Sequence, residues 1–539
     1  MFYFGSKASS NLSQLFYRLM ADTDTVGVDI ESVSLKDKTI VGVGIAPTTE
    51  DCFYFTEGEY HHVRNVLAND RITKVFHNCL FDLEELWYLG VARPVIGDTA
   101  YMARLLGLPG SLSDLVVALH ENGWADRLYR ACNMGALMKE YHAKKTTEMP
   151  QEIVAAKCAD DCRATLMAYR AMCPHLDVDT QEAYDVDVRM VPILLAIGKR
   201  GILLEQDRVE ELISTYEQKV THWRHVSGIL GLANPASPAQ VSVALQKRGV
   251  LYPKWSRGKY RVSTDERTLK FKGDMLAQMV LKFRADNYFL THYARPLRGK
   301  IRQYSHYHLD AATSRMSSYD MNLMNIPKGP ARNCFIPDSG WYTCADGSQM
   351  QLRALAFESQ DPVMLRVYEN DGDIHQETAD YFGMKRTSMI KSVNFGMVFG
   401  ATPETIMDTA NVNDYALAER LISGWAKKYK VAWEWINHMR EVGLRDGVVY
   451  THFGRKLFVP LDRGRAHAMR CAVNFPIQGM EAECIKRWLI ACDNRGKFEL
   501  ANIVHDEGVF DGYYDDLPDL NDFAPFQCPM NVKYIRRWE

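Results

Sequence analysis

The chain has 539 residues, too many for one hydrophobic core, so three or four domains are expected. Hydrophobic residues make up 47% and charged residues 24%, an ordinary globular composition, and no apolar run is long enough to span a membrane. The net charge of −3 excludes a polybasic tail but leaves room for a local basic groove. The N-terminus lacks a secretory-signal pattern, and the twelve cysteines lack CxxC pairs, which predicts a cytoplasmic protein with reduced thiols.

The predicted elements change character along the chain. Strand-like segments alternate with turns over residues 24–56, and helical patterns follow, which predicts an α/β unit ending near residue 178. A helical region comes next, and its periodicity is interrupted at Ala233–Pro238. Strands are then predicted near 335–346 and long helices over 350–445. The sequence therefore predicts a multidomain α/β protein.

A first group of acidic residues lies near the N-terminus. The stretch "VGVDIESVSL" places Asp29 and Glu31 two apart on a strand, so their side chains share one face. The stretch "FHNCLFDLEEL" places Asn78 and Asp82 at i and i+4 of a predicted helix, and "KCADDCRATL" adds Asp161. Each acid taken alone is more typical of a solvated side chain or a helix cap.

A second pair of acids lies in the C-terminal half. Asp346 ends a strand-like run, and in "ANIVHDEGVFDG" two strand-like runs are joined by His505, Asp506 and Glu507. Alone, Asp346 is typical of a helix N-cap and Asp506 of a polar turn. Together, two aspartates at strand ends can hold two Mg²⁺ ions roughly 3.5–4 Å apart, which activate an attacking hydroxyl and stabilise a leaving phosphate.

A predicted helix between these two aspartates carries one lysine and two aromatic residues. In "KRTSMIKSVNFGMVFGAT", Lys391, Phe395 and Phe399 follow one helix face at i, i+4 and i+8. Such a stripe is consistent with core packing. It is equally consistent with a lysine that meets a triphosphate and rings that meet a base, and the residues alone leave both interpretations open.

These stretches resemble the three polymerase motifs of family A DNA polymerases, in the same order and at similar spacing. The motifs are "DGSQMQLR" at Asp346, "KSVNFGMVFG" at Lys391 and "HDE" at 505–507. Supporting matches are "TSRMSSYDMNLMNIP" (313–327), "DIHQETA" (373–379), "FGRKL" (453–457) and "RCAVNFPIQGMEAE" (470–483). The N-terminal acids resemble the 3′→5′ exonuclease domain that precedes the polymerase in this family. Many bacterial members also carry a 5′-nuclease domain, which we expect to be missing here because the sequence starts directly at the exonuclease.

The resemblance implies roles for individual residues. The implied polymerase metal ligands are Asp346 and Asp506, and Lys391 is expected to bind triphosphate oxygens. The implied metal ligands for phosphodiester hydrolysis are Asp29, Glu31, Asp82 and Asp161. The expected contacts with nucleotide, primer and template are His375, Phe395, Phe399, Gln351, Arg386, Arg315, Arg470, Asn474, Gln478 and His505. The implied cofactor is Mg²⁺, two ions per centre, with Mn²⁺ as the alternative.

The resemblance also implies the fold and the partners. An RNase H-like exonuclease domain precedes a right-hand polymerase of thumb, palm and fingers. The predicted boundaries are 1–178 for the exonuclease, 179–300 for the thumb and connecting helices, 301–358 and 446–539 for the palm, and 359–445 for the fingers. The expected function is template-directed DNA synthesis with 3′→5′ proofreading, on primer–template DNA and dNTPs, by a monomer that contacts no membrane. By analogy we expect a phage or plasmid replication enzyme in the host cytoplasm, with replisome partners unspecified.

The chain departs from the family pattern at several positions. Lys157 stands where the exonuclease motif has Tyr, which predicts a slower exonuclease or one in which the lysine takes part. Gln351 replaces a Glu and Phe399 a Tyr, which leaves ribose discrimination open. The family usually has an Arg four residues before its catalytic Lys, and Thr387 stands at that position here. The nearest arginine, Arg386, lies one residue earlier, which on a helix points its side chain about 100° away.

Other functions remain as alternatives. In the first alternative, the chain acts mainly as a 3′→5′ exonuclease and synthesises DNA only weakly. A non-catalytic primer–template-binding subunit is disfavoured by the retained carboxylates, and a single-subunit RNA polymerase by the exonuclease acids and by Phe395. The residues expected to contact phosphates in a basic cleft are Arg315, Lys328, Arg332 and Lys456.

Overall fold

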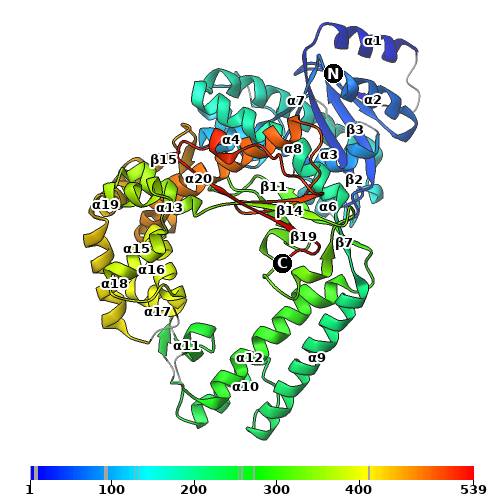
Figure 1. The fold of residues 1–539 in the computed structure, drawn as a ribbon. Coiled ribbons are helices and arrows are strands. Elements are labelled where there is room, and N and C mark those ends of the chain that lie inside the picture. Colours follow the sequence, from blue (N-terminus) through cyan, green and yellow to red (C-terminus); the bar gives the residue numbers. More distant parts are fainter. Residues whose placement is uncertain are drawn as a thin grey trace. The chain divides into compact units, whose positions relative to one another are not determined.

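The chain divides into two compact units in the computed structural model (Figure 1). The structure describes residues 2–4, 10–34, 36–89, 95–126, 128–131, 133–252, 254–256, 259–270, 273–410 and 413–539. Unit 1 comprises Met1–Lys199, Tyr307–Met316 and Arg440–Asn494, and unit 2 comprises Arg200–His306, Ser317–Met439 and Arg495–Glu539.

Unit 1 joins an N-terminal α/β region to a later hairpin and a long helix. Its strands are β1 (Phe2–Phe4), β2 (Thr25–Ser32), β3 (Ile40–Ala46), β4 (Cys52–Phe55), β5 (Thr73–Phe76), β6 (Ile96–Asp98), β15 (Val448–Tyr450) and β16 (Lys456–Phe458). Its helices are α1 (Ser10–Ala21), α2 (Tyr60–Ala68), α3 (Cys79–Leu86), α4 (Thr99–Leu106), α5 (Leu112–Glu121), α6 (Met134–Glu140), α7 (Gln151–Met172), α8 (Val178–Arg200) and α20 (Arg465–Asn494).

Unit 2 contains the long helices of the middle of the chain and the C-terminal strands. Its strands are β7 (Ile202–Leu204), β8 (Lys254–Ser256), β9 (Lys259–Arg261), β10 (Arg302–Gln303), β12 (Ser317–Tyr319), β13 (Phe335–Ile336), β14 (Tyr342–Gly347), β17 (Leu500–Val504), β18 (Glu507–Asp511) and β19 (Met530–Ile535). Its helices are α9 (Gln206–Ile229), α10 (Pro238–Lys247), α11 (Glu266–Lys270), α12 (Met275–Phe289), α13 (Met350–Ser359), α14 (Pro362–Glu369), α15 (Ile374–Tyr381), α16 (Ser388–Val398), α17 (Pro403–Ala410) and α18 (Tyr415–Lys428). The division between the units runs through β11 (His306–His308) and α19 (Lys430–Asp446).

The N-terminal sheet of unit 1 has the strand order β1-β4-β3-β2-β5-β6. Strand β2 pairs antiparallel with β3 and parallel with β5, so it lies in the interior of the sheet. The predicted strands of residues 24–56 are thus confirmed as β2, β3 and β4.

Helix α7 packs directly against β2 and β3, because two glycines leave room for it. A Cβ atom at Gly27 would collide with the carbonyl oxygen of Cys162, and one at Gly44 would collide with the Cys162 and Cys158 sulfurs. This close approach brings polar side chains of α7 to the same place as those of β2.

Unit 2 is built around the antiparallel sheet β17-β18-β14-β19. Strand β14 pairs with β18 on one side and with β19 on the other. Helices α9 and α12 pack side by side (Figure 1). The predicted break at Ala233–Pro238 is confirmed, since α9 ends at Ile229 and Ser237 caps α10.

Candidate active sites

A two-residue turn, His505–Asp506, joins β17 to β18. Glu507, which we expected within the connection, is instead the first residue of β18 and lies opposite Asp346 in the sheet. The amide of Gly347 donates a hydrogen bond of 3.2 Å to the carbonyl oxygen of Asp506. The two predicted polymerase aspartates therefore lie at adjacent strand ends.

Asp346 belongs to strand β14 and does not cap a helix, because the N-cap of α13 is Gln349, with φ of 54°. Burial raises the pKa of Glu507, Arg332 opposes this rise, and the charge of Asp346 adds to it. The donor set at this edge is rich in carboxylates, which are the ligands that Mg²⁺ prefers. The residues thus fit divalent cations.

Arg332 is buried, with 4% of its surface exposed, and the phosphate contact expected of it stays a prediction. Its Nη1 lies 3.8 Å from Glu507 Oε2, and its guanidinium lies 4.5 Å from the centre of the Trp538 ring. Its Nε donates a hydrogen bond of 3.0 Å to the carbonyl of Ile326. Arg332 therefore supports the strand that follows the turn from inside the protein.

The lysine–aromatic stripe lies on α16 for only part of its predicted length. Lys391 is exposed and Phe395 half-buried, but Phe399 lies beyond the last helical residue, as the C-cap. The reason is Gly400, whose φ of +66° ends the helix. Lys391 is thus accessible to a ligand, as a triphosphate contact requires.

His375 is buried in α15 and is held by a polar network from neighbouring helices. Its Nδ1 lies 2.9 Å from Nδ2 of Asn394, while Oδ1 of Asn394 accepts a hydrogen bond of 2.9 Å from Trp425. Burial lowers the pKa of His375 to about 4. The imidazole is therefore neutral, Nδ1 accepts from Asn394, and Nε2 carries the proton. Sequence reasoning missed Asn394, which lies within the "KSVNFG" motif.

The arginine beside the lysine helix already has a protein partner. Arg386 forms an ion pair with Asp373, the residue that caps α15. Thr387 is the N-cap of α16 and thus precedes the helix. Gln351 lies half-buried in the first turn of α13.

Helix α20 presents three predicted minor-groove residues along one stripe. Arg470 is exposed, and Asn474 and Gln478 are half-buried, whereas their neighbours from 471 to 480 are buried. Their spacing of four residues places them on one helix face. The structure thus places these three side chains on one face of α20, and their contact with a minor groove stays a prediction.

Two of the remaining predicted DNA contacts are engaged in ion pairs within unit 1. Arg315 pairs with the buried Glu481. Lys456 Nζ lies 2.7 Å from Asp177 Oδ2. Lys328, in unit 2, is exposed.

The four predicted exonuclease acids gather in unit 1. Asp29 and Glu31 project from β2, and Oδ1 of Asp82 accepts a hydrogen bond of 3.3 Å from the amide of Ile30, between them. We had predicted that Asn78 and Asp82 lie on one helix, and this prediction is wrong for Asn78. It is the N-cap of α3, in a left-handed conformation with φ of 69°.

Lys157 lies among these acids. Its Nζ is 2.8 Å from Glu31 Oε1, 2.8 Å from Asp161 Oδ2 and 3.6 Å from Asp29 Oδ2. Its side chain is only 12% exposed. The lysine at this motif position thus pairs with three of the four acids.

The four acids outnumber the one lysine, so burial disfavours their ionisation even with Lys157 present. Burial raises the pKa of Glu31 to about 8 and that of Asp29 to about 6, against the opposing effect of Lys157. The pKa of Asp82 is raised well above its usual value by burial and by the charge of Asp29. Buried carboxylates with too few cations fit a divalent metal.

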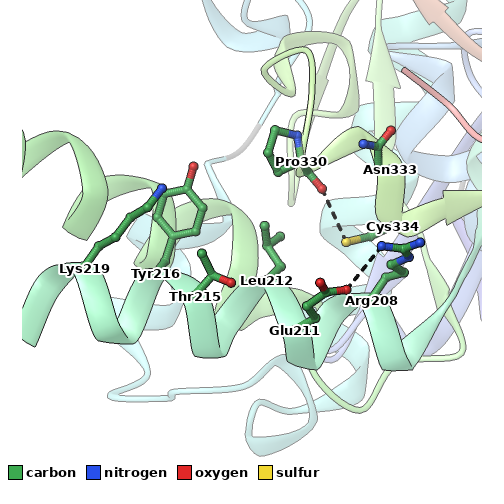
Figure 2. A pocket seen from close by; sticks show the side chains of 9 residues that line it. All are labelled: Arg208, Glu211, Leu212, Thr215, Tyr216, Lys219, Pro330, Asn333 and Cys334. Atoms are coloured by element: carbon green, nitrogen blue, oxygen red, sulfur yellow. Dashed lines mark hydrogen bonds and ion pairs between the residues drawn. The ribbon is translucent and has the colours of Figure 1, made fainter.

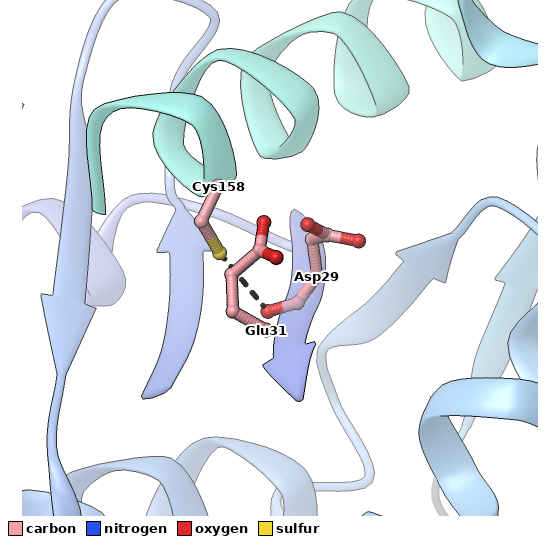
Figure 3. A group of neighbouring side chains, drawn as sticks. All are labelled: Asp29, Glu31 and Cys158. Carbon is pink, nitrogen blue, oxygen red and sulfur yellow. Dashed lines mark hydrogen bonds between the residues drawn. The ribbon is translucent and has the colours of Figure 1, made fainter. Parts of the chain in front are cut away.

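Cys158 lies beside Asp29 and Glu31, and one ligand atom of each residue lies within 4.8 Å of the others (Figure 3). Its thiol donates a hydrogen bond of 3.5 Å to the backbone carbonyl of Asp29 (Figure 3). Burial raises its pKa well above the usual value, which keeps it a thiol and a poor ligand. The described cysteines are all free, and Cys132 lies outside the described residues.

A pocket of about 250 Å³ lies within unit 2, apart from the predicted site residues (Figure 2). It is lined by Arg208, Glu211, Leu212, Thr215, Tyr216, Lys219, Pro330, Asn333 and Cys334. Arg208 Nη1 lies 3.2 Å from Glu211 Oε2 within it. In the part of the chain that the structure describes, no helix has the length and apolar character needed to cross a membrane.

The family comparisons match both halves of the chain. Residues 206–527 match the model described as DNA polymerase family A, and residues 3–177 match that of a 3'-5' exonuclease. DNA polymerase I of Pseudomonas aeruginosa is 26% identical over 529 residues, covering 88% of this chain and 56% of the relative. DNA polymerase I of Caldicellulosiruptor bescii is 28% identical over 367 residues, covering 62% of this chain and 43% of the relative. The chain spans about half the length of the curated relatives it matches.

A solved structure shows the same fold. It is the POL domain of Pol1 from M. smegmatis in complex with DNA primer-template and dNTP, with a TM-score of 0.81 and 19% identity, covering 100% of this chain and 99% of that chain. The predicted fold class, an RNase H-like exonuclease domain followed by a right-hand polymerase, is confirmed. The chain belongs to DNA polymerase family A, with a 3'-5' exonuclease domain ahead of its polymerase region.

Proposed function

We propose that the chain extends primer 3′ ends on a DNA template with dNTPs and removes nucleotides from 3′ ends at a separate exonuclease centre. The observation that carries this proposal is the hairpin that sets Asp506 beside Asp346 in a chain of this family. The proposed division into thumb, palm and fingers keeps the boundaries predicted from the sequence.

At the polymerase centre, Asp346 and Asp506 are the proposed ligands of two Mg²⁺ ions, or of Mn²⁺. When bound, such ions favour the ionised primer hydroxyl and neutralise the charge of the leaving pyrophosphate. Lys391, which is exposed, is proposed to bind triphosphate oxygens, as a point charge that needs no fixed orientation.

The nucleotide and the duplex are proposed to meet separate surfaces. The ring of Phe395 lies 5.5 Å from that of the neutral His375, and the two offer an aromatic wall and an Nε2–H donor to the incoming nucleotide. Arg470, Asn474 and Gln478 present donors to minor-groove acceptors, which check pair geometry without reading the sequence. His505, at the hairpin tip, is proposed to face the primer end.

At the exonuclease centre, the proposed ligands of divalent metal are Asp29, Glu31, Asp82 and Asp161, and Lys157 pairs with three of these acids. The same carboxylates orient the terminal phosphodiester and water for hydrolysis. The chief alternative, an exonuclease with weak synthesis, draws on the engaged Arg386 and on Thr387 outside the helix. Monomeric state and phage origin remain predictions.

The test uses a 5′-labelled primer on a longer template with Mg²⁺, with and without the four dNTPs. We expect Asp506→Ala to abolish extension and to leave shortening intact, and Asp82→Ala to do the reverse. Asp515→Ala, on the exposed segment after β18, serves as the matched control. Shortening without extension by the unchanged chain would establish the alternative.

A further inference from the structure

The unusual feature of the exonuclease centre is that its lysine points inward. A lysine side chain ordinarily carries its ammonium to water, and Lys157 has the length to do so. Instead Nζ lies at 2.8 Å from both Glu31 and Asp161, and within ion-pair distance of Asp29. The ammonium therefore competes with any metal for carboxylate oxygens that the family resemblance assigns to two ions.

We propose that the ammonium of Lys157 takes the place of one cation, so that the exonuclease centre holds a single divalent metal ion. This inference rests on the proposed exonuclease function and revises the pair of ions expected from the sequence. Lys157 is thus a positioning residue that fixes Glu31 and Asp161 from within the site.

The charges favour one ion. Four carboxylates and one ammonium leave three negative charges, since Asp29, Glu31, Asp82 and Asp161 each contribute one when ionised. Before a substrate phosphate binds, one divalent ion leaves one net negative charge, whereas two ions leave one net positive charge, with the ammonium counted in both totals. Like charges at such separations repel strongly where water is largely excluded, and Lys157 is only 12% exposed.

The contact distances favour one ion as well. Glu31 and Asp161 are held closely by the ammonium, while Asp29 is held more loosely, at 3.6 Å. Asp82 approaches β2 through the amide of Ile30. Asp29 and Asp82 are accordingly the carboxylates proposed to hold the single ion.

The experiment counts ions with Mn²⁺ as the probe. Two Mn²⁺ ions in one site give a spin-coupled electron paramagnetic resonance spectrum that a single ion does not. The full chain carries Asp346→Ala and Asp506→Ala, so that the polymerase centre contributes no pair. A single-stranded oligonucleotide with phosphorothioate 3′ linkages supplies substrate phosphates without rapid cleavage.

We expect a single-ion spectrum for the chain with Lys157 and for Lys157→Arg. We expect a coupled pair for Lys157→Met, with the first Mn²⁺ bound at least about tenfold more tightly because one positive charge is gone. Arg170→Met removes a charge from the exposed side of the same helix and is expected to change neither result. Lys157→Gln repeats the test with a polar side chain, in case Lys157→Met disturbs folding.

A coupled pair in the presence of Lys157, or a single ion in both neutral variants, would overturn the inference and leave the exonuclease function standing. If the chain with Lys157 binds no Mn²⁺ at Asp29 and Asp82, the exonuclease function and the inference are overturned together. The two failures are therefore distinguishable without an activity measurement.

Discussion

Unit 1 contains two clusters in which a lysine meets buried carboxylates, and they differ in charge balance. In the first, Arg455 binds Asp187 with both terminal nitrogens, at 2.8 and 3.0 Å, and reaches Glu483 with Nε at 3.1 Å. Lys486 Nζ lies 2.7 Å from the same Asp187. Two cations thus face two carboxylates among α8, the β15–β16 region and α20.

The second cluster is the exonuclease centre, where one lysine faces four acids. There burial raises the pKa values of Asp29 and Glu31, whereas Arg455 and Lys486 overcome burial and hold the pKa of Asp187 at about 2. Charge balance therefore separates the two roles. A neutral buried network holds helices in place, and an unbalanced one is open to an external cation.

Breaking the balanced cluster is expected to have the largest effect. Arg455→Met leaves Asp187 and Glu483 buried without their main partner, which costs about 3–5 kcal/mol of unfolding free energy. Urea unfolding, read from hydrogen exchange of α20 peptides, measures the change. The neighbouring Lys456→Met removes a more exposed pair and is expected to cost about 1 kcal/mol or less. Equal costs for the two would contradict the comparison.

The unbalanced cluster is expected to respond to pH. Because the pKa of Glu31 is raised to about 8 in the folded state, folding takes up a proton between roughly pH 4.5 and 8, so metal-free stability falls as pH rises through that window. Glu31→Gln removes this pH dependence. Between pH 5.5 and 7.5, the free energy of unfolding of the variant is expected to rise by at least about 1 kcal/mol relative to that of the wild type.

Urea unfolding in EDTA, read from α7 peptides, checks this prediction. Glu152→Gln, on an exposed position of the same helix, controls for the loss of a carboxylate. The contribution of Asp187, with a pKa of about 2, is present above pH 3.8 and is lost only as pH falls toward 2, so it stays constant in this window. An unchanged difference between Glu31→Gln and wild type across the range would count against an unbalanced centre.

Loss of a single hydroxyl from the balanced cluster is expected to have a smaller effect than loss of Arg455. Thr451 Oγ1 donates a hydrogen bond of 2.6 Å to Glu483 in the balanced cluster. Thr451→Val keeps the shape of the side chain and removes the donor. We expect the free energy of unfolding to fall by about 1–3 kcal/mol, because the acceptor is charged and buried. The exposed Thr405→Val is the control, and α20 exchange again provides the readout. No change would mean that Arg455 alone satisfies Glu483.

The sequence predicted where these carboxylates lie in the fold, because alternation along a strand and motif order are local properties. Asp29 and Glu31 share a face of β2, and Asp506 lies in a hairpin turn, as the spacing indicated. Phe399 was placed on the helix because a 3.6-residue period does not show where a helix ends. The glycine that follows it does.

What the sequence did not reveal depends on packing between distant segments. The burial of Arg332 requires the C-terminal Trp538, and the neutral His375 requires Asn394 and Trp425 from other helices. The inward direction of Lys157 follows from the close approach of α7 to β2. None of these is visible in local periodicity.

The pairing of β14 has a consequence for the order in which the protein acquires its chemistry during translation. Both neighbours of β14, the strands β18 and β19, come from the last 33 residues, so the sheet that bears Asp346 forms only when the end of the chain has been made. The acids of the exonuclease centre all lie within the first third, and α7 completes them early. Since protein segments generally fold as they emerge from the ribosome, the acids of the proposed exonuclease centre are all synthesised, together with α7, before the sheet of the proposed polymerase centre is able to form.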